Sequence, residues 1–183
     1  ALIHHILKTA GVPTTMGGNI GLPILAQDPL PEGGVYVLEL SSYQIDLTQS
    51  LDCDVAVLLN ITPDHLDRYE SFEAYAASKA RLFEMQTAGS HSPGTLAVID
   101  FGTVVEGLLE RPVRSIALDE VLQFTEFRPE DQKGCPALQG PHNFENAQAA
   151  IAAASHLGVD YETIEQALRT YPGLPHRMER ARE

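Results

Sequence analysis

Three residues in the first half of the chain, Glu39, His65 and Lys79, have side chains that can contribute to a metal site. Glu39 ends an apolar run, where a buried carboxylate needs a partner such as a divalent cation. His65 follows the next apolar run, and imidazole is a common metal ligand whose tautomer a neighbouring carboxylate can fix. The pattern predicts a metal site. The alternatives are that Glu39 is solvated or paired with an arginine, and that His65 is an ordinary polar residue of a loop.

Lys79 lies on a predicted helix, 72–85, where an apolar side chain is expected. Burial lowers the pKa of a lysine, and a neutral amine can react with carbon dioxide to form a carbamate, which is an anionic oxygen ligand for a metal. The alternative is a lysine that extends past the helix edge into solvent. The i, i+3, i+4 spacing places it in a stripe with Phe72, Tyr75, Ala76, Leu82 and Phe83.

Two segments nearer the end of the chain have side chains suited to a nucleotide. Asn143 and Asn146 are one helical turn apart, so their amides can read one flat hydrogen-bonding ligand such as a purine edge. Helix capping is the alternative for Asn143. Arg177 follows a Pro- and Gly-rich stretch and suits a phosphate, although a solvated surface arginine fits its position equally well.

The elements that must position these residues alternate between strand and helix. Continuous apolar runs at 35–40 and 55–60 are typical of strands buried on both faces of a parallel sheet. We therefore expect an α/β fold with a doubly wound, mostly parallel sheet, organised as one domain over 1–183. Ligands in such folds bind beyond the C-terminal ends of the strands. The remaining predicted strands are 14–15, 95–99, 114–118 and 122–127, and the remaining predicted helices are 1–10, 103–110, 143–157 and 161–171, with Gly11, Gly158 and Asp160 as end signals.

Composition narrows the classes of partner. The 183 residues include 12 Lys and Arg against 25 Asp and Glu, and the net charge of -13 disfavours a nucleic-acid partner. The sequence contains neither an apolar run of about 20 residues nor a secretory signal, so we expect no membrane association. Cys53 and Cys135 match no metal or disulfide spacing, and we expect reduced thiols in a cytoplasmic protein.

The residues taken in order resemble the Mur ligases, which use ATP to join an amino acid to a UDP-sugar peptide. The resemblance covers nearly the whole chain and implies a P-loop NTPase-like central domain. It implies Mg²⁺ held by Glu39, His65 and a carbamylated Lys79. It also implies adenine contacts from Asn143 and Asn146, and a phosphate contact from Arg177. Substrate-side contacts are implied for Asn19 and Ser41. The segments that carry the resemblance are Gly18-Asn19-Ile20-Gly21, Leu38-Glu39-Leu40-Ser41-Ser42-Tyr43-Gln44, 60–68, Ala77-Ser78-Lys79-Ala80-Arg81, 140–146 and 173–179.

The amino-acid sequence of segment 38–44 most resembles the branch of the family that adds D-glutamate. The expected partners are then UDP-N-acetylmuramoyl-L-alanine and D-glutamate, with ATP and Mg²⁺ as cofactors. The first predicted helix has an end signal but no N-cap, and the family's phosphate loop is absent. We therefore expect a central domain cut at both ends that is inactive by itself. Another Mur ligase, a folylpolyglutamate synthase and a non-catalytic nucleotide-binding module are the alternatives.

Overall fold

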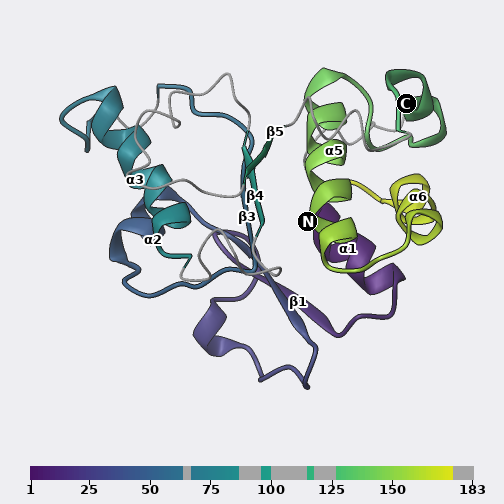
Figure 1. Ribbon diagram of the computed structural model, residues 1–183, viewed down its shortest axis with the longest axis horizontal. Coiled ribbons are helices and arrows are strands. Elements are labelled where there is room, and N and C mark those ends of the chain that lie inside the picture. The colour runs from purple at the N-terminus through teal and green to yellow at the C-terminus, as the bar shows by residue number, and fades with distance from the viewer. Residues whose placement is uncertain (64–66, 87–95, 100–114, 118–126, 175–183) are drawn as a thin grey trace, which may run out of the picture. The chain divides into compact units, whose positions relative to one another are not determined.

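The computed structural model describes residues 1–63, 67–86, 96–99, 115–117 and 127–174. The chain divides into two units, one formed by Ala1–Glu39 with Thr125–Glu183 and the other by Leu40–Phe124. Each unit contains parallel strands and helices of its own (Figure 1).

The first unit packs helices against a pair of parallel strands. Strand β1 (Thr14–Gly18) pairs with β2 (Val35–Glu39), in a register that sets Gly18 opposite Glu39. Helix α1 (Leu2–Thr9) packs against α5 (Pro141–His156) and α6 (Tyr161–Thr170), and Figure 1 shows α1 beside α5. Two short 3₁₀ helices, η1 (Ile24–Ala26) and η3 (Pro129–Gly134), complete its described elements. The core of this unit includes Ile6, Leu7, Leu138, Ile151, Ile164 and Leu168, with Val35 and Val37 packed against it.

Helix ends in this unit follow the expected signals. Gly11 has a φ of 74°, and its N–H donates to the carbonyl of Lys8. The N–H of Val12 donates to the carbonyl of Leu7. That paired arrangement satisfies the last free carbonyls of α1, and Gly158 ends α5 in the same way. The carboxylate of Asp160 accepts from the N–H of Thr163 at 2.8 Å and caps α6. The three predicted end signals are confirmed.

The second unit contains three parallel strands in the order β3 (Val55–Leu58), β4 (Leu96–Ile99) and β5 (Ser115–Ala117). Helices α2 (Ser42–Leu47) and α3 (Phe72–Glu84) pack against each other (Figure 1). The fully buried Phe83 packs with Ala56 of β3 and Ala80, and so joins α3 to the sheet.

The predicted α/β class with parallel strands is confirmed, although the described strands form two parallel sheets, one in each unit. Helix α5 begins at Pro141, two residues before the predicted start. The predicted helix 103–110 and the predicted strand at 122–127, except for its last residue, lie outside the described residues. Among the parts of the chain that the structure describes, no helix has the length and apolar character to cross a membrane.

Helix α2 was not predicted from sequence, and local hydrogen bonds account for its start. Ser41 is the N-cap: its hydroxyl accepts from the N–H of Gln44 at 3.3 Å, and the Gln44 side chain accepts from the N–H of Ser41 at 2.9 Å. This capping box satisfies two donors that would otherwise have no partner. A six-residue helix is marginal without such support.

We predict that Ser41→Ala destabilises the first turn of α2 by about 1 kcal/mol, because alanine cannot accept the bond from Gln44. Amide hydrogen exchange at residues 42–46 should become about fivefold faster. Ser41→Asp should preserve slow exchange, since aspartate is an equally good N-cap. Ser71→Ala removes the matching cap of α3 and should act only on the first turn of that helix. Unchanged exchange in Ser41→Ala would contradict the assignment.

Candidate functional site

The C-terminal ends of β1 and β2 bring Asn19 and Glu39 together. The N–H of Asn19 donates to the carbonyl of Glu39 at 2.6 Å. Gly18 makes this approach possible: its φ is 103°, and a Cβ there would lie 2.3 Å from the Glu39 carbonyl oxygen. The exposed Asn19 therefore lies at the strand edge where ligands of α/β folds bind.

Glu39 is exposed at the end of β2, so the expectation of a buried carboxylate is wrong for this residue. Among the described residues β2 pairs only with β1, and the exposed side chain of Tyr36 belongs to the same strand.

Lys79 lies on α3 among buried positions, as its helical spacing predicted. Tyr75, Ala76 and Phe83 are buried, while Lys79 itself is half-buried. Its Nζ lies 5.5 Å from the centroid of the Tyr75 ring, within the range of a cation–π contact. Lys79 thus lies half-buried beside the buried residues of α3, with its amine near an aromatic ring.

The two asparagines of α5 lie together on one face near its start. The Asn146 side-chain amide donates to Oδ1 of Asn143 at 3.5 Å, and the Asn143 amide donates to the carbonyl of Gln139 at 2.9 Å. Gly140 is the N-cap of α5, so the capping alternative for Asn143 is wrong. Because both side chains are half-buried, a ligand can still reach them from the exposed side.

Three other predicted site residues have different outcomes. Ser41 is half-buried and acts as the N-cap of α2, and its O–H also donates to the side-chain oxygen of Gln44 at 3.0 Å. His65 and Arg177 lie outside the described residues. Glu39 belongs to the first unit and Lys79 to the second, so the predicted convergence of Glu39, His65 and Lys79 stays a prediction.

Sequence reasoning missed a polar cluster directly beside Lys79. Ser78 precedes Lys79 on α3, is buried, and donates a hydrogen bond to Asp46 of α2 at 2.6 Å. A signal was available, because Ser78 lies within the buried face of a helix, where a hydroxyl must find a partner.

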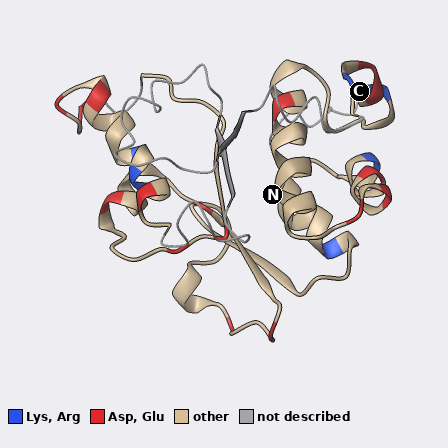
Figure 2. Ribbon diagram, in the orientation of Figure 1, with Lys and Arg blue, Asp and Glu red and all other residues tan. Residues whose placement is uncertain are grey.

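The electrostatic setting is acidic, and neither thiol is suited to nucleophilic chemistry. Figure 2 shows Asp and Glu over both units, in keeping with the net charge of -13. Burial, with the charges of Asp52 and Asp54, raises the pKa of the Cys53 thiol to about 11. Burial also raises the pKa of Cys135, and both cysteines are free. At neutral pH both thiols stay protonated.

Sequence comparison finds relatives along the whole chain. The family model described as "Mur ligase middle domain" matches residues 1–105. The chain is 54% identical to the UDP-N-acetylmuramoylalanine--D-glutamate ligase of Zymomonas mobilis over 183 residues, which are 100% of this chain and 40% of that enzyme. The enzyme of the same name from Novosphingobium aromaticivorans is 54% identical over 185 residues, with the same coverage. The chain thus spans about 40% of the length of these curated relatives.

Structural comparison finds the same fold in a solved enzyme. A crystal structure of MurF from Acinetobacter baumannii superposes with a TM-score of 0.64 at 19% identity, covering 100% of this chain and 45% of MurF. At that identity the likeness concerns the fold alone. The matched family model and the identity along the whole chain show that this chain belongs to the Mur ligase family, with the family's middle domain over residues 1–105.

Proposed function

We propose that the chain is the ATP-using central domain of a ligase that joins D-glutamate to UDP-N-acetylmuramoyl-L-alanine in peptidoglycan synthesis. The observation that carries this proposal is the 54% identity, along the whole chain, to bacterial enzymes named for that reaction. Because the chain spans about 40% of those enzymes, the activity belongs to the complete protein, in the cytoplasm where its nucleotide substrates are made.

The proposed reaction has two steps, which balance without an oxidant or reductant. The alanyl carboxylate of the UDP-sugar attacks the γ-phosphorus of ATP, forming an acyl phosphate and releasing ADP. The amine of D-glutamate then attacks the acyl carbon, releasing phosphate and a proton as the amide forms. Both steps depend mainly on positioning and on neutralising charge among anionic reactants.

For the nucleotide, we assign the adenine edge to Asn143 and Asn146 and a phosphate contact to Arg177. The two asparagine amides are 3.5 Å apart on one face of α5, so they can address one planar ring.

For the metal, we assign Glu39 together with His65 and a carbamate of Lys79. Glu39 fits Mg²⁺, because its exposed carboxylate is a hard oxygen donor at a strand end. We assign the carbamate to Lys79 because this half-buried lysine lies beside the buried residues of α3. Within the described ranges, no group of three or more His, Cys, Asp or Glu side chains is placed to hold a metal. In this proposal the carbamate of Lys79 supplies an oxygen ligand. The ion would neutralise phosphate charge.

On the substrate side we assign Asn19 and Ser41. Asn19 is exposed at the C-terminal edge of β1, beside Glu39. Ser41 follows Glu39 by two residues and, as the N-cap of α2, stands at the positive end of that helix. The side-chain amide of Asn19 is suited to donate to an anionic substrate, whereas Ser41 would have to redirect the O–H that it donates to Gln44 Oε1 at 3.0 Å.

Assays of the full-length protein with UDP-N-acetylmuramoyl-L-alanine and ATP test the proposed specificity. We expect phosphate release that requires D-glutamate. L-Alanine, a diamino acid and D-alanyl-D-alanine, each offered with this acceptor, should not support it. Turnover with one of these and not with D-glutamate would assign the protein to another branch of the family.

We predict that Lys79→Ala in the full-length protein abolishes ligation and that acetate or formate partly restores it. Alanine leaves a cavity beside the proposed metal, and a free carboxylate can supply the missing oxygen ligand. His65→Ala should not respond to carboxylates, because they reproduce a nitrogen ligand poorly. Lys8→Ala, at an exposed lysine of α1, is the control and should stay active. Normal activity of Lys79→Ala, or no rescue with the fold intact, would exclude the carbamate role.

We predict that Asn146→Ala raises the KM for ATP by about three- to tenfold with a smaller effect on kcat, since one hydrogen bond to adenine is lost. Steady-state kinetics with ATP as the varied substrate measure this change. His142→Ala is the matched control, because His142 is exposed in the same turn of α5. An unchanged KM in Asn146→Ala would remove the adenine assignment.

A further inference from the structure

The carboxylate of Asp46 joins α2 to α3 and to the segment before α3. Ser78 of α3 donates to one carboxylate oxygen at 2.6 Å, and the hydroxyl of Tyr69 donates to the other at 2.7 Å. The Tyr69 and Ser78 oxygens are themselves 3.2 Å apart. Three segments that are 9 to 32 residues apart in sequence therefore meet at one carboxylate.

Arg81 makes a second connection between the two helices. Its guanidinium donates to the carbonyls of Ile45 at 3.3 Å, Asp46 at 3.1 Å and Thr48 at 3.1 Å. These carbonyls lie at the C-terminal end of α2, where a helix lacks partners of its own. The same guanidinium lies 3.8 Å from the Asp46 carboxylate. Arg81 therefore fixes the end of α2 that carries Asp46.

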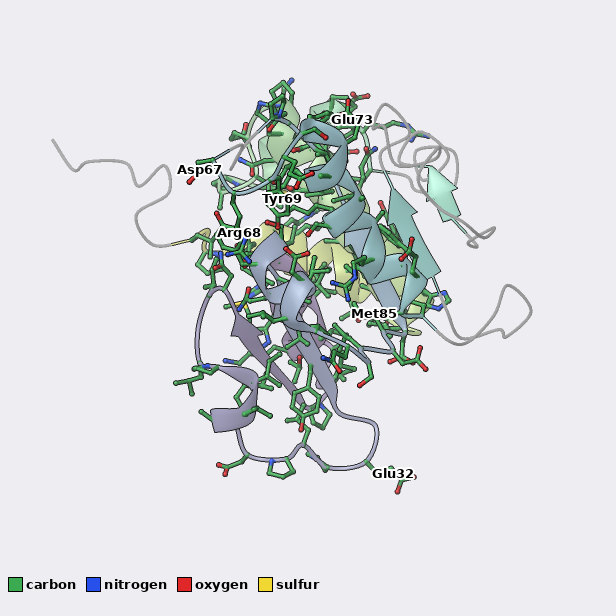
Figure 3. The ribbon with its side chains drawn as sticks, turned by 90° about the vertical axis from the view of Figure 1, so that its left-hand side faces the viewer. Glu32, Asp67, Arg68, Tyr69, Glu73 and Met85 are labelled. Atoms are coloured by element: carbon green, nitrogen blue, oxygen red, sulfur yellow. The ribbon has the colours of Figure 1, made fainter. Side chains whose placement is uncertain are left out.

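Aromatic rings continue this cluster towards Lys79. The Tyr69 ring stacks at 6.4 Å on Tyr43 and lies 5.3 Å from Tyr75, whose ring faces Lys79. The guanidinium of Arg68 lies 4.2 Å from the centroid of Tyr43. Figure 3 shows Arg68 and Tyr69 beside the ribbons of α2 and α3. The cluster thus extends from α2 to the helix turn that carries Lys79.

Asp46 is ionised in this setting. Partial burial would raise its pKa, but the hydrogen bonds from Ser78 and Tyr69 and the charges of Arg68 and Arg81 outweigh that effect and hold the pKa below its ordinary value. At neutral pH the carboxylate can accept both hydroxyl hydrogens.

We propose that Asp46 and Tyr69 are positioning residues for Lys79. The Asp46 carboxylate fixes the rotation of α3 through Ser78, the residue before Lys79, and Tyr69 fixes the segment that leads into α3. Asp46 and Tyr69 thereby determine the position of the Lys79 amine. This inference rests on the proposed role of Lys79 in ligation, and it adds residues to which no substrate contact is assigned.

Directionality distinguishes this cluster from ordinary helix packing. Apolar packing, such as that of Phe83 on Ala56, resists large movements of α3, and the two charge-assisted hydrogen bonds to one carboxylate add a defined direction. A displacement of about 1 Å in a catalytic group can lower turnover by about a hundredfold. Loosening the cluster should therefore reduce kcat while the nucleotide contacts of α5 stay intact.

The test compares Asp46→Asn and Tyr69→Phe with the parent enzyme at full length. Asparagine keeps the shape of Asp46 but replaces one acceptor with a donor, and phenylalanine removes only the hydroxyl. Asp160→Asn is the matched control, because it removes the same charge from the N-cap of α6 and asparagine caps equally well. We expect kcat to fall about tenfold or more in both test variants, with the KM for ATP within about twofold of the parent.

A second readout follows the carbamate itself. The protein is equilibrated with ¹³C-bicarbonate, and carbamate resonances are recorded by ¹³C NMR. The resonance that is missing from Lys79→Ala is assigned to Lys79. We expect this resonance to shift or weaken in Asp46→Asn and Tyr69→Phe and to stay unchanged in Asp160→Asn. Higher bicarbonate should restore part of the lost kcat, since a displaced amine holds its carbamate less well.

The outcomes separate this inference from the proposed function. If Lys79→Ala is inactive while Asp46→Asn and Tyr69→Phe keep parental kcat and resonance, the inference alone is wrong. If their kcat falls only as far as the folded fraction measured by circular dichroism, the cluster is merely structural and the inference is again wrong. If Lys79→Ala is fully active, the role of Lys79 fails and the inference fails with it. If Asp46→Asn does not fold, the kcat and the resonance of Tyr69→Phe decide whether the inference holds.

Discussion

Parallel pairing of strands is the constraint on which the arrangement of this chain depends. Two consecutive parallel strands cannot be joined by a hairpin, so the chain must cross back between them, usually through a helix. The carboxyl ends of the strands then lie at one edge of each sheet. In the first unit this edge carries Asn19 and Glu39, which are neighbours because Gly18, the residue before Asn19, pairs with Glu39. Side chains just past the end of a strand lie outside the buried part of the sheet, so polar residues are tolerated there.

Patterns that depend on neighbours in sequence could be predicted. Gly11, Gly158 and Asp160 mark helix ends through bonds that span no more than five residues, and the structure confirms all three. The spacing of Lys79 on α3 and of Asn146 on α5 also followed from helix geometry. The start of α5 was placed two residues too late. Gly140 caps that helix without a side chain, and Pro141 at the first helical position was the available signal.

Features that depend on distant partners could not be predicted in this way. Helix α2 is too short to show a hydrophobic period. The capping box of Ser41 and Gln44 was a local signal for its start, but its far end is held by Arg81, which lies 33 to 36 residues away. Asp46 reads as an ordinary polar residue until Tyr69 and Ser78 are seen to converge on it. The exposure of Glu39 likewise depends on which strands pair with β2, and the sequence of β2 alone does not determine that pairing.

The choice of an acidic residue at position 46 is itself informative, because an apolar side chain would stabilise the packing of α2 on α3 without having to be desolvated. A hydrogen bond to a charged group contributes roughly 1.5–3 kcal/mol, and partial burial of the carboxylate offsets part of that gain. The net benefit to stability is therefore modest. What the carboxylate provides beyond stability is direction, since Ser78 reaches it from α3 and Tyr69 from the segment before α3, each through a hydrogen bond of defined geometry. Directional hydrogen bonds of this kind are useful where one side chain must be placed accurately. Lys79, the residue after Ser78, is the side chain that we propose they place.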